Sequence, residues 1–393
     1  MMRWNKIDSM LFCDGLLEEF LTSAEGNRLE RASVMALPGA WVGCMEFGSW
    51  RVELREESGL ARLLHRSGEC LVGEESRLFY ALKAFLSRKD KERAAQGFGL
   101  VLAGGGARGA YEIGVWKALK ETGLYNKISC VAGTSVGAIN SLLFQLGDWD
   151  AGKELWMRMS DPSVRKKERE VIERFTRTYE KRYHRSLFPR VLLEYIENGF
   201  ITQPELEKQL LALIKSGRSA LNQASPAYST ITPEKEFPTL LPAFFTGSKP
   251  QRNLCGSPSE HYISWRGLSN MDIVRLIMAS AAIPPVYEPI NFWNNRYFDG
   301  GLYDNVPIWP LLNAGCKRFI VVELRRSGSS WYTPAPLAPH QVCVIRPGDG
   351  FADDFASTFD FSMGNTAKLI RRGYDESVRT LEEVARKTQS VVV

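Results

Sequence analysis

The sequence is poor in the residues that build disulfide frameworks and metal centres. Its 393 residues include seven cysteines, an odd number without a CxxC pair, and only four histidines. This scarcity excludes a zinc site of ordinary spacing and favours free thiols in a reducing compartment. We therefore expect a protein that uses no metal or other cofactor.

Membrane and secretion signals are also missing. No run of about 18 apolar residues occurs, so we expect no membrane-spanning helix. The first residues lack the apolar core and the cleavage site of a signal peptide. We expect a cytoplasmic protein, or one at the periphery of a membrane, while export by a route independent of such a signal stays open.

No strong charge bias, internal repeat or low-complexity tract is present. The formal net charge of +5 permits weak attraction to anionic surfaces and gives no reason to expect nucleic-acid binding. Hydrophobic residues make up 44% of the chain and charged residues 24%, as in an ordinary globular protein with a substantial core.

The N-terminal part of the chain has a less regular pattern than the rest. Alternating residues and turn signals at 34–55 predict strands, and the apolar spacing at 78–86 predicts a helix. The charged stretch 88–93 is typical of a solvated linker. We therefore divide the chain into an N-terminal accessory α+β region at 1–95, of unknown role, and a main domain at 96–393.

A regular strand–loop–helix order begins at Phe98. Residues 98–103 are almost all apolar, which predicts a buried strand of the parallel kind. After a glycine loop come an amphipathic helix at 110–122, a second strand at 128–132 and a tight turn into another helix. This order predicts a parallel sheet with right-handed crossovers.

The later segments are more varied. The charged segment 164–190 predicts a solvated helix, with a basic face for anionic phospholipid headgroups as the weaker alternative. A hairpin is predicted around Asn294-Asn295, and it ends at Asp299. The other expected elements are a helix at 271–280, strands at 319–323 and 342–345, and a closing amphipathic helix at 362–388.

The glycine loop fits two functions. Gly104, Gly106 and Gly109 form a GxGxxG pattern between a strand and a helix, as in dinucleotide-binding folds. Those folds need an acidic residue about 20 residues further on, at the end of the next strand. The strand at 128–132 has none, so a nucleotide-binding protein is the alternative hypothesis rather than the first.

The second strand leads instead into a GxSxG pattern, Gly133-Thr134-Ser135-Val136-Gly137. Between a strand and a helix this pattern predicts a nucleophile elbow, in which small neighbours allow a strained turn. The start of the following helix favours developing negative charge. We therefore predict that Ser135 is a nucleophile, with Gly133 and Gly137 as the glycines of the elbow.

A serine nucleophile needs a base, and the sequence offers two candidates. His340 alone among the histidines follows Asp299, as the order of an α/β-hydrolase triad requires, but it lies in a proline-bounded loop typical of a surface histidine. Asp299 follows a strand in a glycine turn, where the spacing also fits an ordinary turn aspartate.

The order of the motifs resembles that of patatin-like phospholipases. The motifs are Gly104-Gly105-Gly106-Ala107-Arg108-Gly109, Gly133-Thr134-Ser135-Val136-Gly137, Met278-Ala279-Ser280-Ala281-Ala282-Ile283-Pro284 and Asp299-Gly300-Gly301. The resemblance extends from about 97 to about 325, more weakly to 388, and does not cover 1–95. It implies a three-layer α/β/α fold with a mostly parallel central sheet.

The resemblance also implies a chemistry. Ser135 would attack an ester carbonyl, and Asp299 would take its proton and later activate water. The implied oxyanion hole consists of Gly104, Gly105 and Gly106, with Arg108 beside them. Members of the family cleave acyl chains from phospholipids or other lipids and need no calcium for catalysis.

We therefore expect a lipid acyl hydrolase, a serine esterase of the phospholipase A type, with an acyl-lipid substrate and peripheral membrane contact. A non-catalytic lipid-binding module on the same scaffold is a further alternative. The presence of both Ser135 and Asp299 disfavours it.

Overall fold

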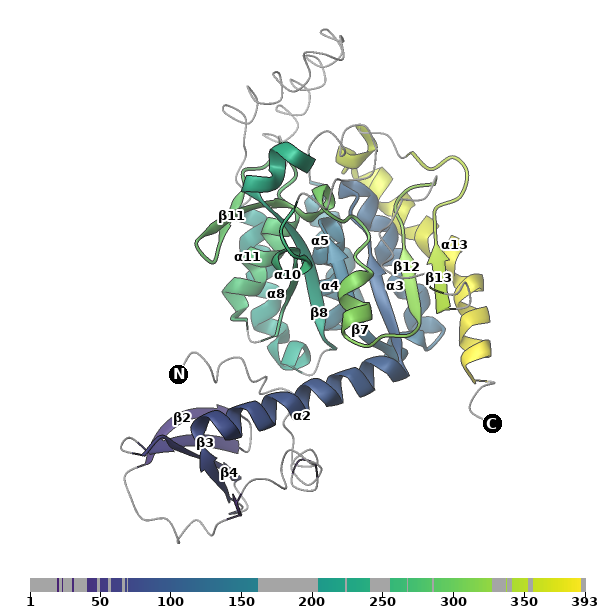
Figure 1. The fold of residues 1–393 in the computed structure, drawn as a ribbon. Helices are drawn as coiled ribbons and strands as arrows, with labels where there is room; N and C mark the ends of the chain where they lie inside the picture. The colour runs from purple at the N-terminus through teal and green to yellow at the C-terminus, as the bar shows by residue number, and fades with distance from the viewer. Residues whose placement is uncertain are drawn as a thin grey trace. The chain divides into compact units, whose positions relative to one another are not determined.

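The chain divides into two compact units, Met1–Arg93 and Ala94–Val393. In this computed structural model the unit that contains the motifs is built around one central sheet (Figure 1). The described residues are 41–47, 50–55, 58–65, 70–161, 204–222, 225–240, 255–266, 268–284, 286–326, 341–352 and 356–389, with single positions at 20, 23, 30, 31, 68 and 337. The charged segment 164–190, the predicted strand residues 34–37 and His340 lie outside them.

The first unit contains an antiparallel sheet followed by a long helix. Its strands lie in the order β1-β5-β4-β3-β2. Their bounds are Glu30–Arg31 for β1, Trp41–Phe47 for β2, Trp50–Arg55 for β3, Leu60–His65 for β4 and Cys70–Glu74 for β5. Val52 and Leu63 of the sheet are buried, as are Leu78, Leu82 and Phe85 of the helix.

That helix, α2, spans Glu75–Gln96, so the predicted linker at 88–93 is wrong. Its charges support a helix rather than a loop, because opposite charges recur three and four residues apart. Arg88 contacts Glu92 at 2.9 Å, and Lys89 contacts the same carboxylate at 3.2 Å. Such pairs stabilise the exposed part of a helix.

The second unit has an eight-stranded mixed sheet in the order β10-β11-β8-β7-β6-β12-β13, with β9 also paired to β8. Five neighbouring strands of this sheet are parallel, namely β8, β7, β6, β12 and β13. The other three, β9, β10 and β11, pair antiparallel. The bounds are Phe98–Leu102 (β6), Ile128–Thr134 (β7), Ala227–Pro233 (β8), Tyr262–Ser264 (β9), Ile290–Phe292 (β10), Asn295–Asp299 (β11), Phe319–Val322 (β12) and Val342–Ile345 (β13).

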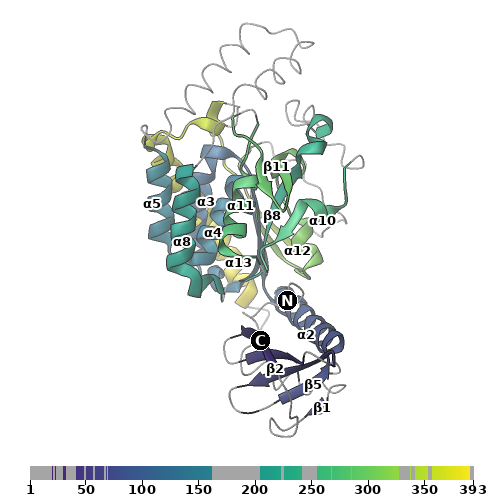
Figure 2. The same cartoon turned by 90° about the vertical axis from the view of Figure 1, so that its left-hand side faces the viewer.

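Helices cover both faces of this sheet, which confirms the predicted three-layer α/β/α class. Figure 2 shows α3, α4, α5, α8, α11 and α13 on one side and α10 and α12 on the other. Each face of the sheet has its own hydrophobic core, and successive strand residues point alternately into one and the other. Leu100, for example, belongs to one core and the next residue, Val101, to the other. The helices span Ala110–Glu121 (α3), Val136–Leu146 (α4), Trp149–Met159 (α5), Pro204–Asn222 (α8), Pro258–His261 (α10), Asn270–Ser280 (α11), Trp309–Asn313 (α12) and Met363–Gln389 (α13).

The hairpin between β10 and β11 turns one residue earlier than predicted. Trp293 and Asn294 occupy the two loop positions, with φ angles of 47° and 62°. Phe292 pairs with Asn295, so Asn295 already belongs to the strand. Two successive residues in the left-handed region form a type I′ turn, which two-residue hairpins favour. Tryptophan is an unusual residue at such a position.

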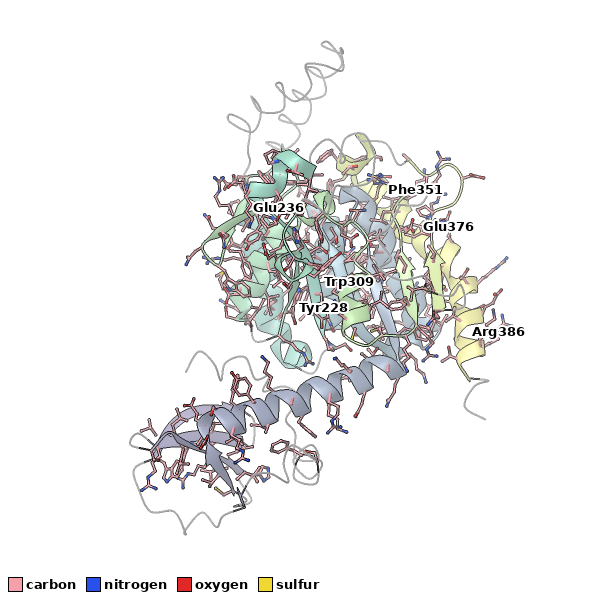
Figure 3. The ribbon with its side chains drawn as sticks, in the orientation of Figure 1. Tyr228, Glu236, Trp309, Phe351, Glu376 and Arg386 are labelled. Carbon is pink, nitrogen blue, oxygen red and sulfur yellow. The ribbon has the colours of Figure 1, made fainter. Side chains whose placement is uncertain are left out.

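Helices α3 and α13 cross at backbone contact. A Cβ atom on Gly114 of α3 would lie 2.0 Å from the carbonyl oxygen of Ile370, and one on Gly373 of α13 would lie 1.9 Å from that of Tyr111. The Tyr111 ring also packs edge-on against Phe351, at 5.9 Å between centroids. Figure 3 labels Phe351. This crossing fixes the C-terminal helix to the helix that follows the glycine loop.

Among the described residues, no helix combines the length and the apolar character needed to cross a bilayer.

Candidate active site

Ser135 lies at the sharp turn between β7 and α4. Its φ of 55° and ψ of −126° put it among the three non-glycine residues with positive φ in the described part of the chain. Such a backbone is strained for a residue with a Cβ atom, and it persists only where the surroundings enforce it. Helix α4 starts at the next residue, so its unpaired N–H groups lie beside the serine.

Two glycines and a second serine enforce this turn. A Cβ atom on Gly133 would lie 2.2 Å from the carbonyl oxygen of Gly137, and one on Gly137 would lie 2.2 Å from that of Leu102. The buried hydroxyl of Ser280, at the end of α11, accepts a hydrogen bond from the Ser135 N–H at 2.9 Å. Sequence reasoning gave Ser280 no role, and its only signal was its place in the motif 278–284.

The register of strands β7, β8 and β11 brings Asp299 level with Ser135. Thr134, at the end of β7, pairs with Thr230 of β8, and Asp299 of β11 pairs with the next β8 residue, Ile231. Asp299 therefore lies at the level of Ser135, across β8. Its backbone is fixed on both sides, because its N–H donates to Ala282 at 3.0 Å and its carbonyl accepts from the Thr232 hydroxyl at 2.9 Å.

The Asp299 carboxyl has the properties of a base. It is 2% exposed, and this burial raises its pKa to about 7, although the Ser135 hydroxyl and the Gly301 N–H both favour the charged form. Oδ1 accepts the Gly301 N–H at 2.7 Å. Within the described residues, the buried Oδ2 has no hydrogen-bond partner of good geometry. A carboxylate with a pKa near neutrality and an unmatched oxygen is suited to accept a proton.

The glycine loop packs against the serine. A Cβ atom on Gly104 would lie 3.1 Å from the Ser135 Cβ, so only glycine allows this approach. The Gly104 N–H donates to the Asn305 carbonyl at 3.2 Å and is therefore committed. The N–H groups of Gly105 and Gly106 have no hydrogen-bond partner among the described residues. These two groups are the donors that the loop leaves available.

Arg108 connects the glycine loop to a distant segment. Its guanidinium is buried, and Nε donates to the Gly105 carbonyl at 3.1 Å. Nη2 donates to the Thr358 hydroxyl at 3.0 Å, in the short 3-10 helix η10, Ala356–Phe359. Arg108 therefore orients the loop through a carbonyl oxygen and ties it to η10.

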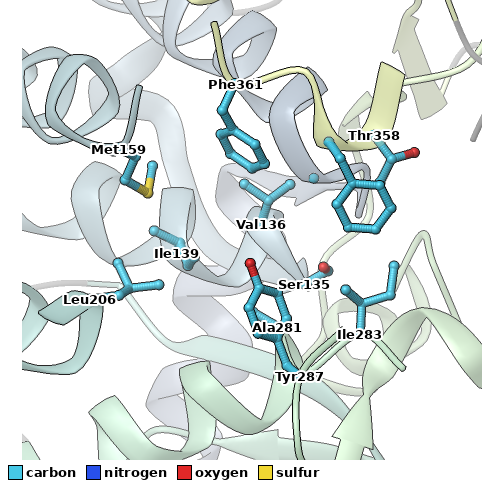
Figure 4. Close-up of a pocket in the computed structure, with 12 residues that line it drawn as sticks. Ser135, Val136, Ile139, Met159, Leu206, Ala281, Ile283, Tyr287, Thr358 and Phe361 are labelled. Carbon is cyan, nitrogen blue, oxygen red and sulfur yellow. The ribbon is translucent and has the colours of Figure 1, made fainter. Parts of the chain in front are cut away.

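A mostly apolar pocket opens beside Ser135 (Figure 4). The empty space within it is about 520 Å³, which includes space open to solvent. Gly106 lines it together with Ser135, so an available N–H donor and the Ser135 side chain share one cavity. The other lining residues are Val136, Ile139, Met159, Leu206, Ala281, Ile283, Tyr287, Thr358, Phe359 and Phe361.

Within the described part of the second unit, no histidine is placed to serve as a base for Ser135. His65 belongs to β4 of the first unit. His261 has both ring nitrogens engaged, with Nε2 2.7 Å from Glu236 and Nδ1 3.0 Å from the Ser257 carbonyl. His340, the candidate for a triad, lies outside the described residues.

Comparison with known proteins connects this arrangement to one family. The model of patatin-like phospholipases matches residues 100–312. Lysophospholipase NTE1 of Debaryomyces hansenii is 23% identical over 58% of this chain and 12% of that protein. An NTE family protein of Mycobacterium tuberculosis is 51% identical over 15% of this chain and 10% of its own length. The chain thus spans about a tenth of the curated relatives it matches.

Among solved structures, VipD from Legionella pneumophila is similar over 90% of this chain and 73% of its own. The sequence identity is 14% and the TM-score 0.40.

Proposed function

The chain belongs to the patatin-like phospholipase family, and we therefore propose that it is a lipid acyl hydrolase with a Ser135–Asp299 dyad. The observation that carries this proposal is the position of a buried, unmatched Asp299 oxygen at the level of a strained serine. A nucleotide-binding role for the glycine loop has less support, because the loop packs on Ser135 and commits the Gly104 N–H to Asn305.

In the first half of the reaction, Ser135 Oγ forms a bond to the ester carbonyl carbon while its proton passes to Asp299. The carbonyl oxygen becomes an oxyanion, which accepts hydrogen bonds from the N–H groups of Gly105 and Gly106. Collapse of this intermediate breaks the ester bond, and the proton on Asp299 goes to the departing alcohol oxygen. Donors preorganised in this way contribute about 3–4 kcal/mol each.

In the second half, water attacks the acyl-serine. Asp299 takes a proton from the water, and the same two N–H groups stabilise the second oxyanion. The bond between Ser135 and the acyl group breaks, the proton returns to Ser135 Oγ, and a fatty acid leaves. The site thus acts as a serine esterase that splits carboxylic esters, as a phospholipase of the A type does.

The pocket supports an acyl lipid as the substrate. Side chains from α4, α5 and α8 give it an apolar wall through Ile139, Met159 and Leu206, and few polar atoms line it. An unbranched acyl chain fits such a wall, because it gains from leaving water and requires no polar partner. Since the acyl chain of a membrane lipid must leave the bilayer to reach Ser135, we also propose that the protein makes peripheral contact with membranes.

The test uses the full chain with a short-chain aryl ester and with phosphatidylcholine vesicles, and it measures released fatty acid. Ser135→Ala and Asp299→Asn are expected to abolish turnover. The matched controls Ser259→Ala and Asp349→Asn, at exposed positions, are expected to retain it. His340→Ala should also retain it. Turnover that persists in Ser135→Ala would refute the dyad, and a severe loss in His340→Ala would favour a triad.

A further inference from the structure

Asn305 contacts the glycine loop through both its main chain and its side chain. Its carbonyl accepts the Gly104 N–H at 3.2 Å, and its Nδ2 donates to the Gly104 carbonyl at 3.0 Å. Both polar groups of Gly104 are therefore satisfied by one residue. The contact is close, because a Cβ atom on Gly104 would lie 2.4 Å from Asn305 Oδ1.

The bond to the Gly104 carbonyl determines where the next N–H points. A peptide unit is planar and trans, so the carbonyl of Gly104 and the N–H of Gly105 point in opposite directions. An amide that holds the carbonyl on one side consequently directs the Gly105 N–H to the other side. Arg108 does the same for the following unit, because it holds the Gly105 carbonyl and thereby directs the Gly106 N–H.

The same segment also reaches the other two motifs. A Cβ atom on Gly301 would lie 3.0 Å from both Asn305 Oδ1 and Asp299 Oδ1, so the Asn305 amide lies beside the loop of the base. The carbonyl of the preceding residue, Asp304, accepts the hydroxyl of Thr134 at 2.8 Å, next to Ser135. Two consecutive residues therefore contact the nucleophile turn, the glycine loop and the Asp299 loop.

We propose that Asn305 is a positioning residue that aims the Gly105 N–H at the oxyanion and keeps the glycine loop aligned with Asp299. It does not touch the reacting atoms. The inference rests on the proposed esterase function. It adds to that function a residue, Asn305, that acts through the orientation of the Gly105 N–H. A residue of this kind affects the stability of the transition state more than the binding of substrate.

The experiment compares Asn305→Ala and Asn305→Asp with wild type and with Asn313→Ala. The aspartate variant keeps the shape but replaces the donor with an oxygen that repels the Gly104 carbonyl. Asn313 is an exposed asparagine at the end of α12 and serves as the matched control. Each protein is assayed with an aryl ester and with its thionoester, in which sulfur replaces the carbonyl oxygen, and its thermal unfolding is followed by circular dichroism.

Both Asn305 variants are expected to lower kcat for the ester about 10- to 100-fold with KM within about twofold of wild type. The ratio of the ester rate to the thionoester rate should fall in both, since this ratio reports donors aimed at oxygen. Asn313→Ala should match wild type in every measurement.

Three results separate the possible failures. An unchanged ester-to-thionoester ratio in folded Asn305 variants, with Ser135→Ala inactive, overturns this inference and leaves the esterase proposal intact. Loss of the folded state in both variants also overturns it, because Asn305 would then serve stability alone. Equal turnover by wild type and Ser135→Ala refutes the esterase proposal itself.

Discussion

Replacement of Asp299 by asparagine should remove activity and at the same time stabilise the protein at high pH. The substitution keeps the shape of the side chain, and its carbonyl oxygen can still accept the Gly301 N–H. It removes a charge that is 2% exposed. Without that carboxylate, Ser135 loses its proposed proton acceptor. We therefore expect a loss of turnover of about 10⁴-fold or more, as is found when one member of a group of catalytic residues that act together is removed.

The expected stability gain follows from the pKa of Asp299. Burial raises that pKa from 3.8 to about 7, which corresponds to about 4 kcal/mol of preference for the neutral form. At pH values below 3.8 the residue is neutral in the folded and the unfolded chain, and the wild type incurs no penalty. As pH rises towards about 7 the unfolded chain ionises first, so wild-type stability falls and then levels off above that value.

The assay is thermal unfolding of wild type and Asp299→Asn between pH 4 and pH 8, with kcat/KM of the wild type over the same range. The difference in unfolding free energy should grow with pH, to roughly 2–4 kcal/mol at pH 8. The wild-type kcat/KM should rise through about pH 7, because only the charged carboxylate accepts the proton. A pH-independent stability difference, or an Asp299→Asn enzyme with most of its activity, would refute this reasoning.

Three further changes test other parts of the second unit. Gly373→Ala should destabilise the second unit by roughly 1–3 kcal/mol, because the added Cβ would clash with the Tyr111 carbonyl oxygen. Gly364→Ala, which has open space around it, should not change the stability, and urea unfolding measures both variants. Ser280→Ala should lower kcat about tenfold with little change in KM, because the Ser135 N–H loses its hydrogen-bond acceptor. Steady-state kinetics measures both constants. Met159→Trp should shift the preference of the enzyme towards shorter acyl chains in a competition among esters of different length, since the ring would fill the pocket.

The sequence was sufficient to predict the parallel strands and the two loops that follow them. Residues 98–102 and 128–134 are buried at every position, and such apolar runs are a local signal of a central strand. Glycines at 104, 106, 133 and 137 marked the close approaches that the structure contains. The closing helix at 362–388 also agrees with α13 to within a residue at each end.

Other features depend on contacts between distant segments, so no local pattern could predict them. The proximity of Asp299 to Ser135 follows from the register of β11 on β8 and of β8 on β7, and at the sequence level it rested on family resemblance. Ser280 and Asn305 gained their roles only when α11 and the segment after β11 reached the loops. The helical ending of α2 has no distinct local signal, because a run of exposed charges is typical both of a linker and of a helix stabilised by ion pairs.

The bond between Arg108 and Thr358 joins residues 250 positions apart, and the α3–α13 crossing lies further still along the chain. During synthesis the ribosome adds the glycine loop, Ser135 and Asp299 before the C-terminal partner of each contact, which is Thr358 in the first and α13 in the second. The pocket wall at Thr358 and Phe361 is likewise added late. A nascent chain that ends before residue 356 therefore already contains Ser135 and Asp299 but still lacks Thr358 and Phe361 of the pocket wall.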